Sequence, residues 1–368
     1  MCGNASTSLS PQFIYGYKTY RGDVCTGADL PVLSCQTNGL FLAGAANTRI
    51  FNIYFYMITG NTITYSSASY TENCKLYGVT AGMISTSGVS TFVNCEIISP
   101  KAQAFTPSAE LNLIGCYIHH TQNIATLAAT SKIINCVFDN IYSGFTLPAL
   151  GVPTLIANNT FYGSESKQMS YGIFLQAGGA IFWNNIIYGF TNAVKHNTSG
   201  NIFNYGDHNN YYNNTANYLN VIQGRNDTFL NPGFVVSTIT GSTASIAGAV
   251  MTDLSGNFNN VVDGYSYCYI TSGASWSFTG TCHRIMSHTP TSVTFEVTTG
   301  VTNATTNHVY EITYSRNFTP NTNMKAAAIP SKYSDGNQPT NNYLDTGAVQ
   351  RIEPLAGSGS VSSTYIGS

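Results

Sequence analysis

One short phrase recurs seven times between residues 72 and 213, and it constrains the fold more than any other feature of the chain. The phrase consists of Asn or Gly, then Cys or Asn, then a pair that is mostly apolar. Its second positions are separated by 21, 21, 20, 23, 26 and 25 residues. A period in this range predicts a solenoid, in which each repeat stacks on the preceding one. The second positions are Cys74, Cys95, Cys116, Cys136, Asn159, Asn185 and Asn210.

The residues around each second position predict strands rather than helices. Apolar side chains mostly occur two residues before and two residues after it, with mixed residues between them. This alternation is typical of a strand with one face turned inward, and the flanking Gly, Ser, Thr and Asn favour turns. We therefore predict an all-β chain wound into a parallel β-helix, with neighbouring coils about 4.8 Å apart. Equivalent residues of successive coils then form ladders, first of cysteines and afterwards of asparagines.

The composition limits the classes of partner. Charged residues make up only 8% of the chain, against roughly 25% in ordinary soluble domains. The net charge of −2 gives no indication of a nucleic-acid partner or of an anionic membrane. A surface of uncharged hydrogen-bonding groups and aromatic rings suits an extracellular or virion protein that contacts carbohydrate. The same bias also follows from the turns and ladders of a solenoid, whatever its function.

The chain shows no segment suited to membrane insertion and no secretory signal at its amino end. Either a signal was removed, or the protein reaches a virion or an extracellular surface without one, and Met1 favours the second explanation. The changes in residue pattern along the chain predict four parts: an N-terminal cap with an irregular first coil (1–40), a parallel β-helix (41–236), a small antiparallel β-barrel or sandwich (237–314), and an irregular C-terminal segment with a flexible tail (315–368).

The nine cysteines do not form a metal-binding pattern. The four ladder cysteines are interpreted as buried free thiols, which pack like small hydrophobic side chains. Disulfides could link Cys25 to Cys35 and Cys268 to Cys282. Since no cofactor motif is present either, we expect neither a metal nor a cofactor.

A row three residues after each ladder position contains the candidate site. His119 and Asp139 should be neighbours one coil apart, where they could form an acid/base pair. Tyr162 and Tyr188 continue the row and could form a platform for sugar rings. The alternative interpretation is that the row lies at a turn and is structural. The row comprises Tyr77, Ile98, His119, Asp139, Tyr162, Tyr188 and Asn213.

Two further ladders are interpreted as structural. Lys75 and Glu96 should lie one coil apart as an exposed ion pair that contributes less than about 1 kcal/mol. The buried amides of Asn159, Asn185 and Asn210 should satisfy one another and the backbone of the turns.

Three features together resemble a known group of proteins. They are the NC and NN coils, the module DGYSYCYITSG with CHRI and SVTFEV, and the phrase YLDTGAVQR from Tyr343. Over residues 50 to 353 the chain resembles right-handed parallel β-helix proteins of the pectate-lyase-like type found in phages and environmental viruses. The resemblance implies a tail-spike-like or other virion surface protein, often trimeric, and it implies no shared catalytic residues.

We therefore expect a non-enzymatic structural and adhesive virion protein. Its partners would be copies of itself, other virion proteins and a host-surface polysaccharide. One alternative is a polysaccharide lyase or glycoside hydrolase that uses His119 and Asp139. Another is a cellular surface or filament protein.

Overall fold

The computed structural model describes residues 12–320 with gaps, the larger of which are 18–29, 36–40, 43–46, 58–62, 79–83, 99–102, 148–152, 164–170, 198–204, 273–280 and 297–304. The chain divides into two compact units. The first combines Met1–Gly233 with Thr319–Ser368, and the second is Phe234–Phe318. Within the described ranges, no helix has the length and apolar character needed to cross a membrane.

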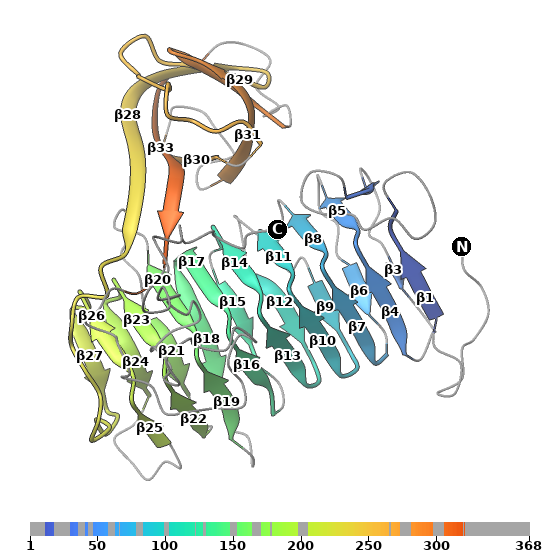
Figure 1. Cartoon of the computed structure of the whole chain (residues 1–368), viewed down its shortest axis with the longest axis vertical. Coiled ribbons are helices and arrows are strands. Elements are labelled where there is room, and N and C mark those ends of the chain that lie inside the picture. The colour runs from blue at the N-terminus through green and yellow to red at the C-terminus, as the bar shows by residue number, and fades with distance from the viewer. Residues whose placement is uncertain are drawn as a thin grey trace, which may run out of the picture. The chain divides into compact units, whose positions relative to one another are not determined.

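The first unit is a parallel β-helix, as predicted, in which three sheets of nine strands run along one axis (Figure 1). Each coil contributes one strand to each sheet, and strands of successive coils pair in parallel.

Sheet A consists of β1 (Gln12–Tyr15), β4 (Thr48–Phe51), β7 (Ser69–Glu72), β10 (Ser90–Val93), β13 (Leu111–Ile114), β16 (Lys132–Ile134), β19 (Thr154–Ala157), β22 (Ala180–Trp183) and β25 (Tyr205–Asp207). Sheet B consists of β2 (Val32–Cys35), β5 (Tyr54–Met57), β8 (Lys75–Gly78), β11 (Glu96–Ile98), β14 (Tyr117–His119), β17 (Val137–Ile141), β20 (Thr160–Gly163), β23 (Ile186–Tyr188) and β26 (Asn210–Tyr212). Sheet C consists of β3 (Phe41–Leu42), β6 (Ile63–Tyr65), β9 (Ile84–Thr86), β12 (Gln103–Pro107), β15 (Asn123–Thr126), β18 (Ser143–Leu147), β21 (Tyr171–Leu175), β24 (Asn192–His196) and β27 (Ala216–Leu219). Thus β1 and β2, in the segment expected to contain a cap and an irregular first coil, are strands of the first coil.

The first residue of the recurring phrase makes the corner between sheets A and B. This residue has a positive φ in the first six of the seven repeats, for example 51° at Asn73 and 64° at Gly115. Asn and Gly tolerate this left-handed conformation better than other residues do. The phrase therefore records a backbone requirement of the corner, which explains why it recurs.

The corner also overturns one expectation from the sequence. We expected the apolar residues two positions before the ladder to face the core, but Val93 and Ile114 lie on the outer side of sheet A, only partly buried. Their neighbours Phe92 and Leu113 face the core instead and are fully buried. The left-handed residue interrupts the alternation of the strand, so the inward face changes parity between sheet A and sheet B.

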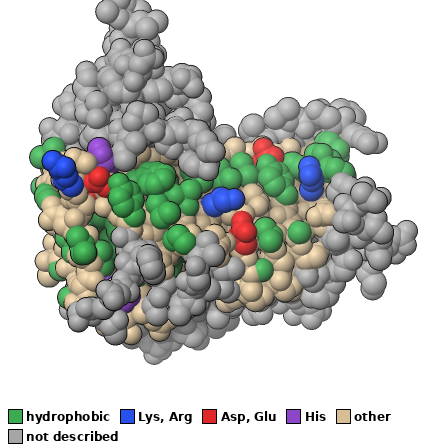
Figure 2. All heavy atoms as spheres, turned by 90° about the horizontal axis from the view of Figure 1, so that it is seen from below, with side chains coloured by type: hydrophobic (Ala, Val, Ile, Leu, Met, Phe, Trp, Pro, Cys, Tyr) green, Lys and Arg blue, Asp and Glu red, His purple; other side chains and the backbone are tan. Residues whose placement is uncertain are grey.

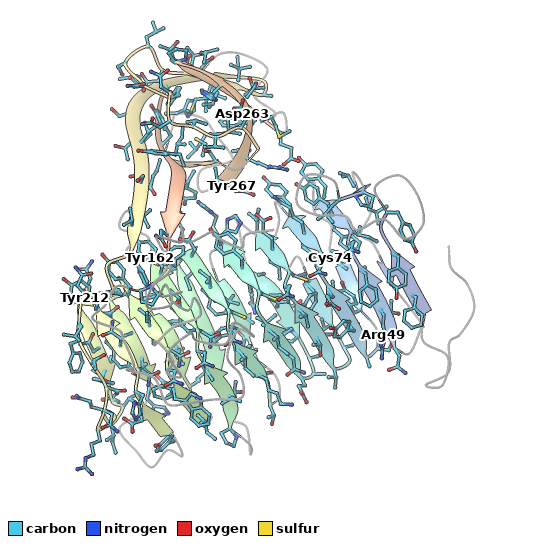
Figure 3. All side chains as sticks on the ribbon, viewed as in Figure 1. Arg49, Cys74, Tyr162, Tyr212, Asp263 and Tyr267 are labelled. Atoms are coloured by element: carbon cyan, nitrogen blue, oxygen red, sulfur yellow. The ribbon has the colours of Figure 1, made fainter. Side chains whose placement is uncertain are left out.

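The predicted ladder lies inside the β-helix. The thiols of Cys74, Cys95, Cys116 and Cys136 are free and buried in the main core, and Cys74 is labelled in Figure 3. Asn159 and Asn185 continue the ladder and are fully buried.

The last predicted member of the ladder is wrong by one residue. Asn209 accepts the backbone N–H of Asn185 at 3.0 Å and therefore occupies the ladder position, whereas Asn210 pairs with Ile186 in sheet B. The left-handed corner of this coil is His208, with a φ of 56°. Because this coil has His where the others have Asn or Gly, matching the pair Asn209–Asn210 to the phrase shifts the alignment by one residue.

Aromatic and aliphatic side chains fill the centre of the β-helix. Phe138 stacks on Phe161 one coil away, with 4.6 Å between ring centroids, and meets Phe145 of sheet C edge to face at 5.3 Å. Each such side chain contributes about 1.5–3 kcal/mol through its burial. Sheets A, B and C enclose one continuous hydrophobic core that runs through the coils.

The second unit is a closed antiparallel barrel, which confirms the predicted small β-module. The strands lie in the order β28, β29, β32, β31, β30, β33. Their bounds are β28 (Val235–Ala247), β29 (Val250–Thr252), β30 (Tyr267–Ser272), β31 (Thr281–Thr289), β32 (Ser292–Phe295) and β33 (Thr305–Asn317). Cys268 is buried in the core of the barrel, and the side chain of Cys282, the partner considered for a disulfide, lies outside the described residues. Cys25 and the side chain of Cys35 lie outside the described residues.

Candidate functional site

One column of side chains on the outer side of sheet B collects the residues that the sequence singled out. Consecutive members are partners in the parallel register, so they repeat at the spacing of the coils, about 4.8 Å. Figure 3 labels Tyr162 and Tyr212 along the same side of the β-helix. The column, which we call the sheet B column, comprises Tyr56, Tyr77, Ile98, His119, Asp139, Tyr162, Tyr188 and Tyr212.

The end of this column differs from the prediction for the same reason as the ladder. Tyr212, not Asn213, is the register partner of Tyr188. Asn213 has a φ of 56° and lies beyond the end of β26.

His119 and Asp139 are neighbours in the register, as the spacing predicted. Both side chains are fully buried. Asp139 Oδ2 accepts a hydrogen bond from the Tyr117 hydroxyl at 2.8 Å, and the Tyr117 ring stacks on the imidazole of His119 with 4.4 Å between centroids.

A charged pair adjoins His119, and it is not the exposed pair expected from the sequence. Lys75 Nζ lies 3.1 Å from Glu96 Oε2, but the Lys75 side chain is only 9% exposed. Its ammonium lies 5.3 Å from the centroid of the Tyr54 ring. Because the aromatic ring and Glu96 enclose the ammonium group, this pair belongs to a partly buried network rather than to the solvent.

The two histidines have defined proton positions. Glu96 Oε1 lies 3.0 Å from Nε2 of His119, and Nδ1 of His119 lies 2.8 Å from Nδ1 of His120. Burial lowers the pKa of His119 and outweighs the opposing effect of Glu96. Neutral His119 therefore donates its Nε2 proton to the carboxylate, which can only accept, and its Nδ1 accepts from His120. His120 also has a positive φ of 50°, an uncommon conformation for histidine.

The His119 site predicts a pH-dependent stability. Because its folded pKa lies below the ordinary value of 6.5, the unfolded chain binds more protons between the two values. The contribution of His119 is therefore complete above pH 6.5 and is lost as the pH falls toward the folded pKa, by at most about 1.4 kcal/mol per pH unit. We expect His119→Gln to reduce the slope of unfolding free energy between pH 7 and pH 5 in urea titrations. An unchanged slope in the variant would assign the acid sensitivity to other groups.

Tyrosines occupy the remaining length of the column. Tyr162 and Tyr188 stack with 4.9 Å between centroids and 10° between planes, and Tyr188 meets Tyr212 at 5.9 Å. Tyr162 is buried, whereas Tyr188 and Tyr212 are partly exposed. The rings support one another across the coils and leave parts of two of them in contact with solvent.

Among the polar side chains around His119, Glu96 and Tyr117 are accessible to solvent. The Glu96 side chain is 30% exposed, and Tyr117 is partly exposed, whereas His119 and Asp139 are not. Sequence reasoning placed Glu96 in the adjacent column without linking it to His119, because only the side-chain geometry shows that it reaches across. Among the residues that the structure describes, no group of three or more His, Cys, Asp or Glu side chains could hold a metal ion.

No family model matches this chain, and no curated protein matches it. Among solved structures, it is similar to a double mutant of the tailspike protein of E. coli bacteriophage HK620 in complex with a pentasaccharide, at 12% identity over 82% of this chain and 74% of that chain, with a TM-score of 0.32. It is also similar to a tailspike protein of Acinetobacter baumannii bacteriophage Fri1, described as a capsular polysaccharide depolymerase, at 10% identity over 82% of this chain and 65% of that chain, with a TM-score of 0.32. Both of these matches are tailspike proteins of bacteriophages.

Proposed function

We propose that this chain is a tailspike-like virion surface protein that binds a host-surface polysaccharide along the outer side of sheet B. The observation that carries the proposal is the solvent-accessible end of the sheet B column, where the partly exposed rings of Tyr188 and Tyr212 follow one another at the spacing of the coils. A polymer with a repeating unit can use such an array several times along its length. Partly exposed Tyr188 and Tyr212 offer ring surface, and Glu96 and Tyr117 offer hydrogen-bonding groups to sugar hydroxyls.

The surface composition supports the same ligand class. Charged residues are scarce, at 8% of the chain, and on the face that Figure 2 shows, the described side chains are mostly hydrophobic or uncharged, with few acidic or basic ones. Neutral hydroxyl-rich ligands suit such a surface better than nucleic acids, which require clustered cations. The pentasaccharide bound to the HK620 tailspike makes oligosaccharides the first ligands to test. Assembly with copies of the chain, as a trimer, and with other virion proteins is part of this proposal and follows from the sequence resemblance.

A second candidate function is cleavage of the same polysaccharide. It is favoured by Glu96, a partly exposed carboxylate held by Lys75 and His119. Asp139, the register partner of His119, is a second carboxyl group in the same network; it is buried and accepts a hydrogen bond from the partly exposed Tyr117. Most glycoside hydrolases use a pair of carboxyl groups in catalysis.

The experiment is a screen of the full chain against an array of bacterial surface polysaccharides, followed by titration of the best ligand. We expect Tyr188→Ala to weaken binding at least about tenfold, because it removes ring surface at the centre of the exposed part of the column. Tyr142, an exposed tyrosine outside the column (39% exposed), provides the matched control, and Tyr142→Ala should bind normally. Equal affinities of the two variants would contradict the proposal.

The same samples separate binding from cleavage. Release of reducing ends by the wild-type chain, and its loss in Glu96→Gln with binding retained, would establish the second function. Binding without release would leave the adhesive function.

A further inference from the structure

The outer side of sheet A carries an arginine held between two aromatic rings. Arg49 of β4 is exposed and lies in register between Phe13 of β1 and Tyr70 of β7. Its guanidinium carbon is 5.7 Å from the centroid of Phe13 and 6.0 Å from that of Tyr70. Figure 3 labels Arg49 on these first coils, on a sheet other than the one that carries the sheet B column. The two ring contacts restrict a side chain that remains exposed to solvent.

The guanidinium has no anion of its own in the described part of the chain. No carboxylate there lies within ion-pair distance of Arg49. The adjacent carboxylate, Glu72, accepts a hydrogen bond from the Tyr70 hydroxyl at 3.0 Å. Burial and this hydrogen bond raise the pKa of Tyr70 to about 12, so the phenol stays protonated and keeps Glu72 engaged. A preorganised cation without a counter-charge is suited to an external carboxylate, which it can bind through two parallel hydrogen bonds.

Aromatic surface lies directly beside the guanidinium. Phe13 and Tyr15 are 51% and 45% exposed, and their rings lie 6.0 Å apart with only 4° between planes. Tyr15 also stacks on Phe51 with 4.6 Å between centroids. The apolar C–H face of a sugar ring packs on exposed aromatic surface of this kind.

From these contacts we infer that Arg49, Phe13 and Tyr15 form a second saccharide site, one that selects a sugar bearing a carboxylate. The cation recognises the acid, and the exposed parallel rings of Phe13 and Tyr15 recognise the sugar. A polyphosphate or nucleic acid fits poorly, because its affinity depends on several clustered cations and the chain has only 14 Lys and Arg residues. This inference does not depend on the sheet B column, which lies on another sheet.

The test compares a glucuronate-containing tetrasaccharide with its carboxyl-reduced, neutral counterpart, by calorimetric titration of the full chain. The wild type should bind the acidic form about tenfold more tightly, as expected for a bidentate carboxylate contact. Arg49→Gln should abolish this preference and leave the neutral affinity unchanged. Arg49→Lys should lose most of it, since an ammonium group cannot form the fork, and Phe13→Leu should weaken both ligands.

Lys132 is the matched control, because it is an exposed cation in the same outer column of sheet A, paired in register with Asn112 and Leu155 instead of aromatic residues. Lys132→Gln should retain the preference. The inference is overturned if the wild type binds both tetrasaccharides equally, or if Lys132→Gln loses as much preference as Arg49→Gln. Polysaccharide binding that depends on Tyr188 but shows no acid preference would overturn this inference alone and leave the proposed function standing.

Discussion

Replacing Asn185 by alanine is expected to destabilise the β-helix by about 3–5 kcal/mol, the largest effect of any single substitution considered for this unit. The side chain makes four hydrogen bonds inside the core. Its Oδ1 accepts from the backbone and side-chain N–H groups of Asn159, and its Nδ2 donates to Ile156 O and Asn209 Oδ1, all at 2.9–3.0 Å. Alanine leaves a buried backbone N–H and a buried carbonyl without these partners. The loss is measured as the shift of the urea midpoint in far-ultraviolet circular dichroism.

The chain itself supplies the matched control for this prediction. In earlier coils the ladder position is cysteine, and Cys116 Sγ lies 3.4 Å from Phe92 O, while Cys116 N lies 3.4 Å from Cys136 Sγ. A thiol thus makes the same two contacts at longer range. Asn185→Cys should therefore cost about 1–2 kcal/mol, clearly less than alanine. Equal losses for the two variants would mean that the ladder contributes packing and no hydrogen-bond energy.

The second large effect is expected in the barrel, at Asp253. This carboxylate is only 2% exposed and accepts hydrogen bonds from Thr243, from the backbone and hydroxyl of Ser255, and from the Tyr310 hydroxyl. Burial alone would raise its pKa, but the bonds from Ser255 and Tyr310 outweigh burial and lower it. Asp253→Ala should destabilise the barrel by about 3 kcal/mol, because the buried hydroxyl of Tyr310 loses its acceptor. Hydrogen exchange of the amides in β28, β30 and β33 measures this loss.

Tyr310→Phe is the control for Asp253. It removes the donor and leaves the carboxylate with its Ser255 and Thr243 partners, so it should cost only about 1 kcal/mol. The double variant should be less destabilised than the sum of the two single variants, since both remove the same bond. Strict additivity would show that this bond does not stabilise the barrel.

The period of the phrase, together with the apolar alternation within it, predicts the parallel β-helix and the column of buried cysteines. Its first residue obeys a backbone rule, because the corner requires a positive φ at positions such as Asn73 and Gly115. The prediction of the ladder is wrong in the coil whose corner residue is neither Asn nor Gly but has the same left-handed conformation. His208 holds the same left-handed corner, so Asn209 and not Asn210 follows it in the ladder.

The inward face of sheet A could not be read from the sequence alone. A strict alternation across the corner placed Val93 and Ile114 in the core, whereas the left-handed residue changes the parity and turns them outward. The sequence also does not predict the other two strands of each coil, because sheets A and C lack a repeated motif of their own.

The sequence predicts which residues of the candidate site are neighbours in successive coils, because the repeat fixes the register. Pairing by coil brought His119 beside Asp139, as the structure has it. The link from Glu96 to His119 depends on how far a side chain reaches across columns, and the sequence does not specify it. The same limit applies to Lys75, whose burial against Tyr54 overturned the expectation of an exposed ion pair.

The most direct test of the proposed function is the dependence of affinity on the length of the bound saccharide. Fragments of the best polysaccharide ligand, from one repeating unit upward, are titrated against the full chain. An array that runs from Tyr117 to Tyr212 predicts an affinity that rises with each added unit until the fragment spans these coils, and a Tyr188→Ala variant in which the rise stops early. An affinity that is already maximal for one unit, or a rise that Tyr188→Ala leaves unchanged, would contradict binding along the sheet B column.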